Sequence, residues 1–125
     1  MDVDRLDHLV LTVVDLAATM EFYQRVLGMS AEVFGDGRRA LHFGDQKINL
    51  HEAGREFEPK AARPTPGSAD LCFITRTPLE EVQQHLLTES VPLELGPVDR
   101  TGARGPMRSL YIRDPDGNLV EIATY

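Results

Sequence analysis

The sequence lacks tryptophan, contains a single cysteine and has no long apolar run, and each absence narrows what the protein can be. One cysteine, Cys72, excludes a disulfide within the chain and is typical of a reducing compartment. We expect Cys72 to act as a small apolar residue buried in a strand. No apolar stretch approaches the length that spans a bilayer, and the acidic first residues lack the basic and apolar regions of a secretion signal. A cytoplasmic protein is therefore expected.

Basic residues are also in the minority, because 13 Lys and Arg face 20 Asp and Glu and leave a net charge of −7. Such a chain is repelled by nucleic acid and by anionic membranes, so neither is expected as a partner. Some basic residues nevertheless fall in or beside two predicted loops: Lys60, Arg63, Arg100, Arg104 and Arg108. Two interpretations stay open for them, a rim that binds an anionic ligand and ordinary solvated loop charges.

What the sequence does contain is a repeated order of elements. The first half reads strand, helix, strand, strand, strand, at residues 6–13, 16–27, 29–34, 39–43 and 47–52. Asp15 and Gly28 are the expected N-cap and C-terminal cap of that helix. The second half repeats the order, with a strand at 69–75, a helix after a capping box at Thr77 that buries Leu79, Val82, Leu86 and Leu87, and strands at 91–95, 107–112 and 119–124.

This repeat predicts an α+β fold of two βαβββ modules in a single domain. The modules cover about residues 5–52 and 69–125, and residues 53–68 link them. We expect the two modules to form a curved mixed sheet around a cavity, with the helices on its outer face. The linker at residues 53–68 is long, and long loops in compact domains are usually lids or binding loops. Loops 53–68 and 98–106 are therefore expected to border the cavity and to move more than the strands.

The last strand carries Glu121 in its centre, directly after an Asp-Pro-Asp-Gly turn at residues 114–117. Matching the two halves places His8 on Asp70 and Asn49 on Glu121, all on the face opposite the helices. One imidazole and two carboxylates suit a divalent metal ion that keeps open positions for water and substrate. We therefore predict His8, Asp70 and Glu121 as metal ligands. Oxygen-rich ligation favours Mn, Mg, Fe or Ni, and Zn remains an alternative.

Further polar residues lie on the same predicted face. His51 follows Asn49 by two positions and has three open roles: a metal ligand, a general base or a residue that only lines the cavity. Asn49 is expected to contact substrate. On the seventh strand Ser109, Tyr111 and Arg113 share the cavity face. An anionic part of the substrate would meet basic residues from the two loops, namely Lys60, Arg100 and Arg104.

Three segments carry a family resemblance: LDHLVLTV at 6–13, FYQRVLGM at 22–29 and DPDGNLVE at 114–121. With them the chain resembles, over nearly its whole length, the vicinal oxygen chelate superfamily of glyoxalase I, fosfomycin-resistance enzymes, extradiol dioxygenases and bleomycin-resistance proteins. NLHE at 49–52, FEPKA at 57–61 and PGSADLC at 66–72 are closest to glyoxalase domain-containing protein 5 and its bacterial relatives. The resemblance implies a metal-binding cavity and a homodimer.

The resemblance also sets the functional expectation. It implies His8 and Glu121 as ligands, whereas Asp70 stands where the superfamily commonly has histidine and Asn49 stands where glyoxalase I has glutamate. We expect a glyoxalase-like metal-dependent lyase or isomerase, or an enzyme of thiol conjugates, that chelates two vicinal oxygens of a small substrate. The alternative is a metal-free protein that sequesters a drug or metabolite. An extradiol dioxygenase is less expected, because the resemblance implies two histidines and one glutamate around iron for such an enzyme, whereas this chain has Asp70 in place of one histidine.

Overall fold

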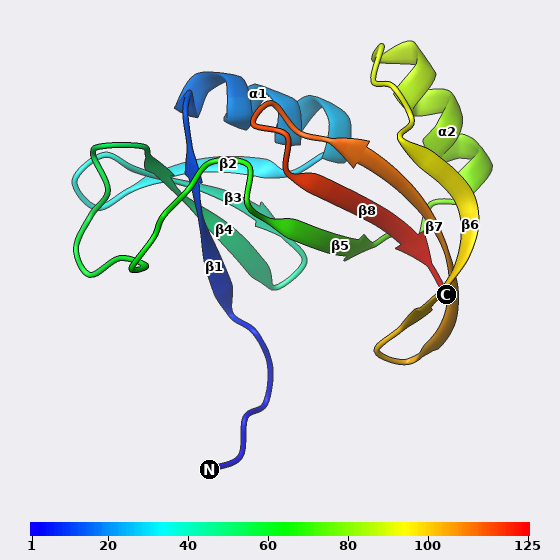
Figure 1. The fold of residues 1–125 in the computed structure, drawn as a ribbon, viewed down its shortest axis with the longest axis horizontal. Coiled ribbons are helices and arrows are strands. Elements are labelled where there is room, and N and C mark those ends of the chain that lie inside the picture. Colours follow the sequence, from blue (N-terminus) through cyan, green and yellow to red (C-terminus); the bar gives the residue numbers. More distant parts are fainter. The chain divides into compact units, whose positions relative to one another are not determined.

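The computed structural model describes residues 1–125 and confirms the α+β class with two βαβββ modules. The chain divides into two compact units, Met1–Pro66 and Gly67–Tyr125, and each unit contains one module (Figure 1). Each module forms its own four-stranded mixed sheet. No helix of the chain has the length and apolar character needed to cross a membrane.

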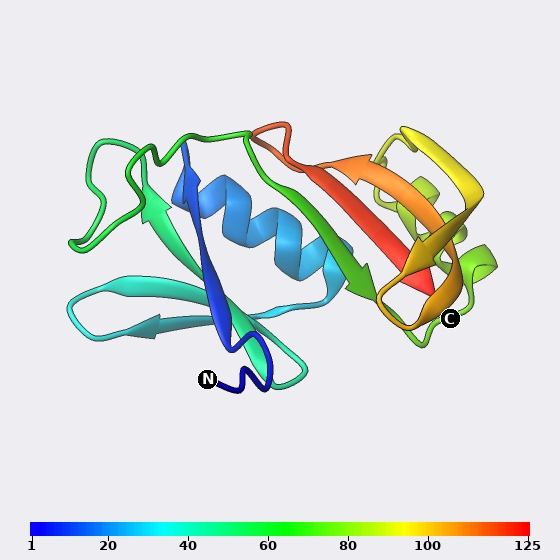
Figure 2. The ribbon, with the colours of Figure 1, turned by 60° about the horizontal axis from the view of Figure 1, so that its bottom comes forward.

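The first unit contains β1 (His8–Val13), α1 (Leu16–Leu27), β2 (Ser30–Phe34), β3 (Arg38–Phe43) and β4 (Gln46–Glu52). Its strands lie in the order β1-β4-β3-β2, with β1 parallel to β4 and the other pairs antiparallel. The α1 helix contacts β2, β3 and β4 (Figures 1 and 2). Its predicted caps are confirmed, because the Asp15 carboxylate accepts the Ala18 N–H at 3.0 Å and Gly28 adopts φ 69°.

The second unit contains β5 (Asp70–Ile74), α2 (Leu79–Thr88), β6 (Leu95–Gly102), β7 (Gly105–Arg113) and β8 (Leu119–Thr124). Its order, β5-β8-β7-β6, repeats that of the first unit, again with the first and last strands parallel. Asn49 lies opposite Val10, and Glu121 lies opposite Cys72. Val10 lies two residues after His8, and Cys72 lies two residues after Asp70. The strand registers of the two units therefore match His8 with Asp70, as predicted.

Some local predictions in the second unit are wrong. α2 begins at Leu79 with Pro78 as its N-cap and without a side-chain cap, so Thr77 does not form a capping box. The Pro78 carbonyl accepts the backbone N–H groups of Glu81 and Val82, at 3.0 and 3.1 Å. Leu87, expected in the core, is 72% exposed.

The strand expected at residues 91–95 is also misplaced. β6 starts only at Leu95 and continues to Gly102, so the predicted loop 98–106 is mostly a hairpin of β6 and β7. The register shifts between Leu95 and Val98, where Gly96 and Pro97 interrupt the ladder. Glycine and proline inside a strand mark such irregularities, and in a sequence they are easily taken for a loop.

The Asp-Pro-Asp-Gly turn is held by a buried hydrogen-bond network. Asp114 Oδ1 accepts the N–H groups of Asp116 and Asn118, each at 2.9 Å. The Asn118 side chain donates to Asp114 Oδ2 at 2.8 Å and accepts the Ala69 N–H at 2.8 Å. Gly117 supplies the positive φ of the turn, 85°. The turn therefore fixes the start of β5, and with it Asp70, beside β8.

Gly67 lies against this turn, and its substitution is the first testable prediction. An added Cβ would meet the Asp116 carbonyl oxygen at 2.5 Å, and φ at Gly67 is +79°. We expect Gly67→Ala to lower the free energy of unfolding by about 2 kcal/mol or more in urea denaturation. Gly54 is the matched control, because it has φ +85° and open space around it. Equal losses in the Gly67→Ala and Gly54→Ala variants would show that the close approach carries no energy.

Candidate functional site

A pocket of about 350 Å³ opens on the face of the second sheet that lies opposite its core, and we call it the Glu121 pocket. Five of the residues predicted for the site line it: Asp70, Arg100, Tyr111, Arg113 and Glu121. They come from all four strands of the sheet. The strand register explains this gathering, since Tyr111 lies opposite Glu121 and both Asp70 and Arg113 lie opposite Leu119.

Glu121 occupies the centre of this face, between Cys72 on β5 and Tyr111 on β7. Its Oε1 atom is buried and has no hydrogen-bond partner. A buried carboxylate oxygen without a donor or a cation is energetically costly. Glu121 Oε1 is therefore the atom of this pocket that most needs a ligand.

Tyr111 connects Glu121 to a cation. Arg100 Nε donates a hydrogen bond to the Tyr111 hydroxyl at 2.9 Å. Burial raises the pKa of Tyr111, and the adjacent Glu121 carboxylate adds to this, whereas the hydrogen bond from Arg100 opposes it. The phenol therefore stays protonated at neutral pH and can donate its own hydrogen bond toward a carboxylate or a ligand.

Arg113 and Glu94 form the other charged pair of the pocket. Arg113 Nη2 lies 3.2 Å from Glu94 Oε1, and its Nη1 donates to the Gly117 carbonyl at 3.2 Å. Glu94 was not predicted, because the strand that follows it was misplaced and no pattern marked it. Cys72 was missed as well, although its alternation with Asp70 along β5 already put it on this face.

Cys72 corrects the expectation of a buried apolar residue, because it is exposed on the pocket side of β5. Its immediate neighbour across the ladder is Glu121. Partial burial of the sulfur, together with the charge of Glu121 and a hydrogen bond to it, raises the pKa of the Cys72 thiol to about 11. The thiol is therefore protonated at neutral pH and is a poor nucleophile.

The raised pKa gives a second prediction. Glu121→Gln removes the negative charge that opposes thiolate formation, so the pKa of Cys72 should fall and more thiolate should be present at pH 8. Alkylation of Cys72 by iodoacetamide, followed by mass spectrometry, is expected to be roughly threefold faster or more in the variant. Glu81→Gln on the exposed surface of α2 serves as the control and should leave the rate unchanged. Equal rates in Glu121→Gln and the parent would place Glu121 outside the reach of the sulfur.

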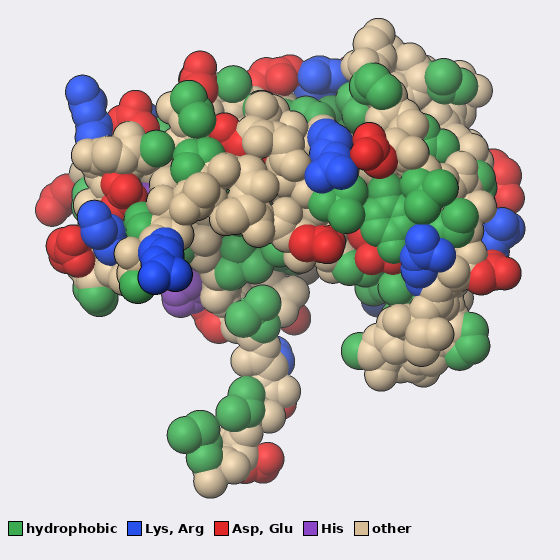
Figure 3. All heavy atoms as spheres, viewed as in Figure 1, with side chains coloured by type: hydrophobic (Ala, Val, Ile, Leu, Met, Phe, Trp, Pro, Cys, Tyr) green, Lys and Arg blue, Asp and Glu red, His purple; other side chains and the backbone are tan.

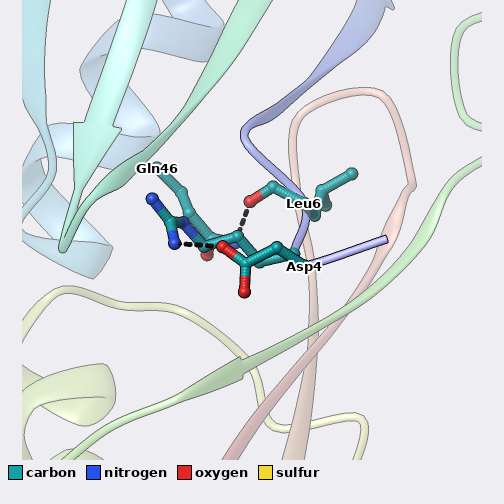
Figure 4. Close-up of polar contacts among 4 residues, drawn as sticks. Asp4, Leu6 and Gln46 are labelled. Carbon is teal, nitrogen blue, oxygen red and sulfur yellow. Dashed lines mark hydrogen bonds and ion pairs between the residues drawn. The ribbon is translucent and has the colours of Figure 1, made fainter. Parts of the chain in front are cut away.

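His8, in the first unit, is the first residue of β1. Its side chain is 45% exposed, and Nδ1 lies 2.7 Å from Asp7 Oδ1, a contact that lowers the pKa of Asp7. The preceding segment is tied to β4, because Gln46 donates to the Leu6 carbonyl at 2.6 Å (Figure 4). Pairing with β4 thus starts before the strand does and fixes the backbone at His8.

Asn49 and His51 lie further along β4 and share one face of that strand, and both are buried. Asn49 Oδ1 and His51 Nε2 have no hydrogen-bond partner. Burial lowers the pKa of His51, and the charges of Arg38 and Lys60 lower it further against the opposing effect of Glu56. The imidazole is therefore neutral at pH 7, which suits both a metal ligand and a general base.

Three predicted substrate residues lie elsewhere. Lys60 Nζ is 3.7 Å from Glu58, within the first unit. Arg104 sits in the β6–β7 turn. Its guanidinium lies over the Tyr125 ring at 5.5 Å, and its backbone N–H donates to the Tyr125 hydroxyl at 2.9 Å. Ser109 faces the same side as Tyr111 but is fully buried, with Oγ lacking a partner. None of the three lines the Glu121 pocket.

The donor groups of the second unit meet part of the needs of a divalent metal ion. The second unit supplies three carboxylates at one pocket: Glu94 is paired with Arg113, Glu121 has an unpartnered buried oxygen, and Asp70 is the third. Oxygen donors of this kind suit a hard divalent cation. The predicted imidazole, His8, belongs to the first unit. Within neither unit do three histidine, cysteine or carboxylate side chains gather as a metal site. The second unit therefore fits a metal by its donor chemistry and provides part of a ligand set.

Comparison with known proteins places these features in a family. The sequence model described as the Glyoxalase/Bleomycin resistance protein/Dioxygenase superfamily matches residues 5–122. A virulence protein of Salmonella typhimurium is 60% identical over 125 residues, which cover 100% of this chain and 87% of that protein. Its crystal structure has a TM-score of 0.99 and covers 100% of this chain and 99% of the crystallised one.

Two further relatives cover the whole chain. A glyoxalase domain-containing protein of Mycosarcoma maydis is 54% identical over 100% of this chain and 70% of its own length. An integron cassette protein of Vibrio cholerae is 58% identical, with a TM-score of 0.98 and 98% of its chain covered. The resemblance to glyoxalase domain-containing protein 5 stays a prediction.

More distant solved structures share only the fold. A lactoylglutathione lyase from Agrobacterium tumefaciens is 23% identical with a TM-score of 0.75, over 98% of this chain and 95% of that one. An antibiotic-binding protein from Streptomyces is 19% identical with a TM-score of 0.76, over 99% and 98%. The fold alone therefore does not decide between catalysis and binding.

Proposed function

Because the chain belongs to the glyoxalase/bleomycin resistance protein/dioxygenase superfamily, we propose that it is a glyoxalase-like metal-dependent enzyme of a small oxygen-rich substrate. The observation that carries the proposal is Glu121 Oε1, a buried carboxylate oxygen without a partner in a pocket lined by charged groups of both signs. A divalent cation would satisfy this atom. A second carboxylate, Asp70, lines the same pocket.

Each residue has a role in this proposal. Glu121 and Asp70 would hold the metal, with His8 of the first unit as the third ligand named by the sequence match. A bound divalent ion would supply Lewis-acid stabilisation of negative charge on two neighbouring substrate oxygens. The protonated Tyr111 hydroxyl would donate a hydrogen bond to a substrate oxygen, and Arg100 would hold that phenol in place. His51, neutral and buried, would act as a ligand or a general base.

A metal-free protein that sequesters a small molecule is the second candidate. It is favoured by the incomplete ligand set that each unit provides by itself. In that case Arg100, Arg113 and Tyr111 would bind polar groups of the captured molecule, and Glu121 would accept a hydrogen bond from it. The two candidates differ in one measurable property, the affinity of the purified protein for a divalent cation.

Metal analysis of protein purified without added metal separates the two candidates. Under the enzyme proposal, stoichiometric divalent metal should be found, or saturable binding of Mn²⁺ should be measured after treatment with a chelating resin. Neither stoichiometric metal nor saturable binding of Mn²⁺, Mg²⁺, Fe²⁺, Ni²⁺ or Zn²⁺ would reject the metalloenzyme and leave the sequestering protein. The readout is elemental analysis and calorimetry, so it does not depend on knowing the substrate.

We also propose that the protein is a homodimer. The end strands of the two four-stranded sheets are β1, β2, β5 and β6, and the edge of an end strand is commonly covered by another chain. Sedimentation at micromolar concentration should give about twice the 13.9 kDa chain mass. A single species of chain mass would contradict the dimer.

A further inference from the structure

We propose that the first unit contains a second ligand site, a small pocket that binds a terminal oxyanion, either a carboxylate or a phosphate group. The pocket has a volume of about 190 Å³ and lies where β3 begins, next to the residues that follow β4. Three arginines, Arg38, Arg39 and Arg55, line it together with one acidic residue, Glu52. We call it the arginine pocket. It shares no residue with the Glu121 pocket.

The charges of the arginine pocket do not balance. Arg55 Nη1 and Glu52 Oε2 are 3.8 Å apart, so the single acid is engaged by one of the three guanidinium groups. Arg38 and Arg39 have no acidic partner. Two positive charges therefore remain uncompensated in a chain whose net charge is −7. Figure 3 shows Lys and Arg side chains, with Asp and Glu side chains among them, on the part of the molecule where the β2–β3 turn and the residues after β4 lie.

Arg38 is held in a fixed position. Its guanidinium lies over the Phe34 ring at 5.1 Å and over the Phe57 ring at 5.0 Å. Stacking of this kind orients the planar group and leaves the N–H donors on its edge available. Arg38 Nε is buried and has no acceptor. An oxyanion is the ligand that would satisfy both this donor and the charge, since a planar guanidinium can bind it with two parallel hydrogen bonds.

The strand geometry explains how neighbouring arginines share one pocket. Successive side chains of a strand point to opposite faces, so Arg38 and Arg39 leave β3 in opposite directions. Both belong to the first two residues of β3, where the sheet ends, and both border the opening. The α1 N-terminus takes no part as an anion site, because the Asp15 carboxylate already caps it.

The volume restricts the ligand. About 190 Å³ is below the range of roughly 300–1,000 Å³ that holds drug-sized molecules. The arginine pocket therefore suits a small anion or the anionic end of a longer molecule. Leu16, Leu50 and Phe57 supply the apolar part of its wall. The expected ligand class is a small organic acid or phosphate ester, bound through its terminal anionic group.

An NMR titration tests the proposal. The parent protein is freed of metal with a chelating resin, since soluble chelators are themselves carboxylates, and is titrated with inorganic phosphate and with acetate at constant ionic strength. Saturable shifts should centre on the backbone amides of residues 37–39 and 55. Arg39→Gln combined with Arg55→Gln should weaken binding by about tenfold or more, because charged hydrogen bonds are lost while the Arg38 stacking remains. Arg108→Gln, in the second unit, is the control and should leave the affinity unchanged.

Each outcome of the titration either supports or overturns the proposed oxyanion site. Saturation by phosphate alone assigns a phosphate site, saturation by acetate alone assigns a carboxylate site, and either supports the proposal when the double variant loses it. Linear shifts without saturation, shifts centred elsewhere, or equal affinity in the double variant and the parent overturn it. Because the protein is metal-free throughout, this result is independent of the proposed metalloenzyme.

Discussion

Glu121→Gln is expected to lower the affinity of the protein for Mn²⁺ by more than about tenfold, which corresponds to about 1.4 kcal/mol. The substitution keeps the shape of the side chain and removes its charge. Glu121 Oε1 is buried without a hydrogen-bond partner, so a cation bound there would lose its charged ligand in the variant. Calorimetric titration of metal-free protein gives the affinity directly.

Glu94→Gln is the matched control for this experiment. Glu94 lines the same pocket, but its Oε1 already lies 3.2 Å from Arg113 Nη2, so its charge is compensated and the Mn²⁺ affinity should change little. His8→Ala is expected to weaken binding as well, and Asp70→Asn to weaken it less. If Glu121→Gln and His8→Ala both bind Mn²⁺ as tightly as the parent, the metal site is misplaced and the sequestering protein becomes the better proposal.

Asp114→Ala is expected to produce the largest loss of stability, about 3 kcal/mol, in urea denaturation. Asp114 is 6% exposed, and its carboxylate accepts two backbone N–H groups and the Asn118 side-chain amide. Alanine leaves these donors without acceptors in a place that water reaches poorly. Asn118, released from Asp114, would also hold the Ala69 N–H less firmly.

Asp36→Ala is the control for the turn. Asp36 also lies in a turn that contains a glycine, but it is exposed, so its replacement should cost less than about 0.5 kcal/mol. A loss of similar size in Asp36→Ala and Asp114→Ala would show that the buried network contributes no more than an exposed turn residue. The Asp114→Ala variant should also show faster hydrogen exchange at the Ala69 amide, which reports the β5 attachment.

Several parts of the fold followed from local sequence patterns. Asp15 and Gly28 mark the ends of α1 because capping depends on a few adjacent residues and needs no distant contact. The match of His8 with Asp70 and of Asn49 with Glu121 was also readable, since strand alternation fixes which side chains share a face. The same alternation placed Tyr111 and Arg113 beside Glu121 at the pocket.

Other parts depended on contacts that the sequence does not display. Gly96 and Pro97 favour a loop, so the sequence did not indicate that β6 starts at Leu95. Pairing of Leu95 with Tyr111 and of Val98 with Ser109 overrides that preference. Glu94 therefore received no role although it pairs with Arg113. Cys72 read as apolar because of its residue type, and its exposure beside Glu121 depends on which groups cover the sheet face.

The sequence by itself determined the two repeated modules, the face on which the polar residues lie and the family to which the chain belongs. The modules and the polar face depend on periodicity, capping and turn chemistry, which act over a few residues, whereas the family rests on resemblance to known sequences. Only the tertiary structure decided that Asp70, Arg100, Tyr111, Arg113 and Glu121 border one pocket, that Ser109 is closed off, and that Arg38 is stacked between two phenylalanines. Burial, orphaned polar atoms and charge compensation arise between strands that are distant in sequence, so they exist only once the sheets have formed.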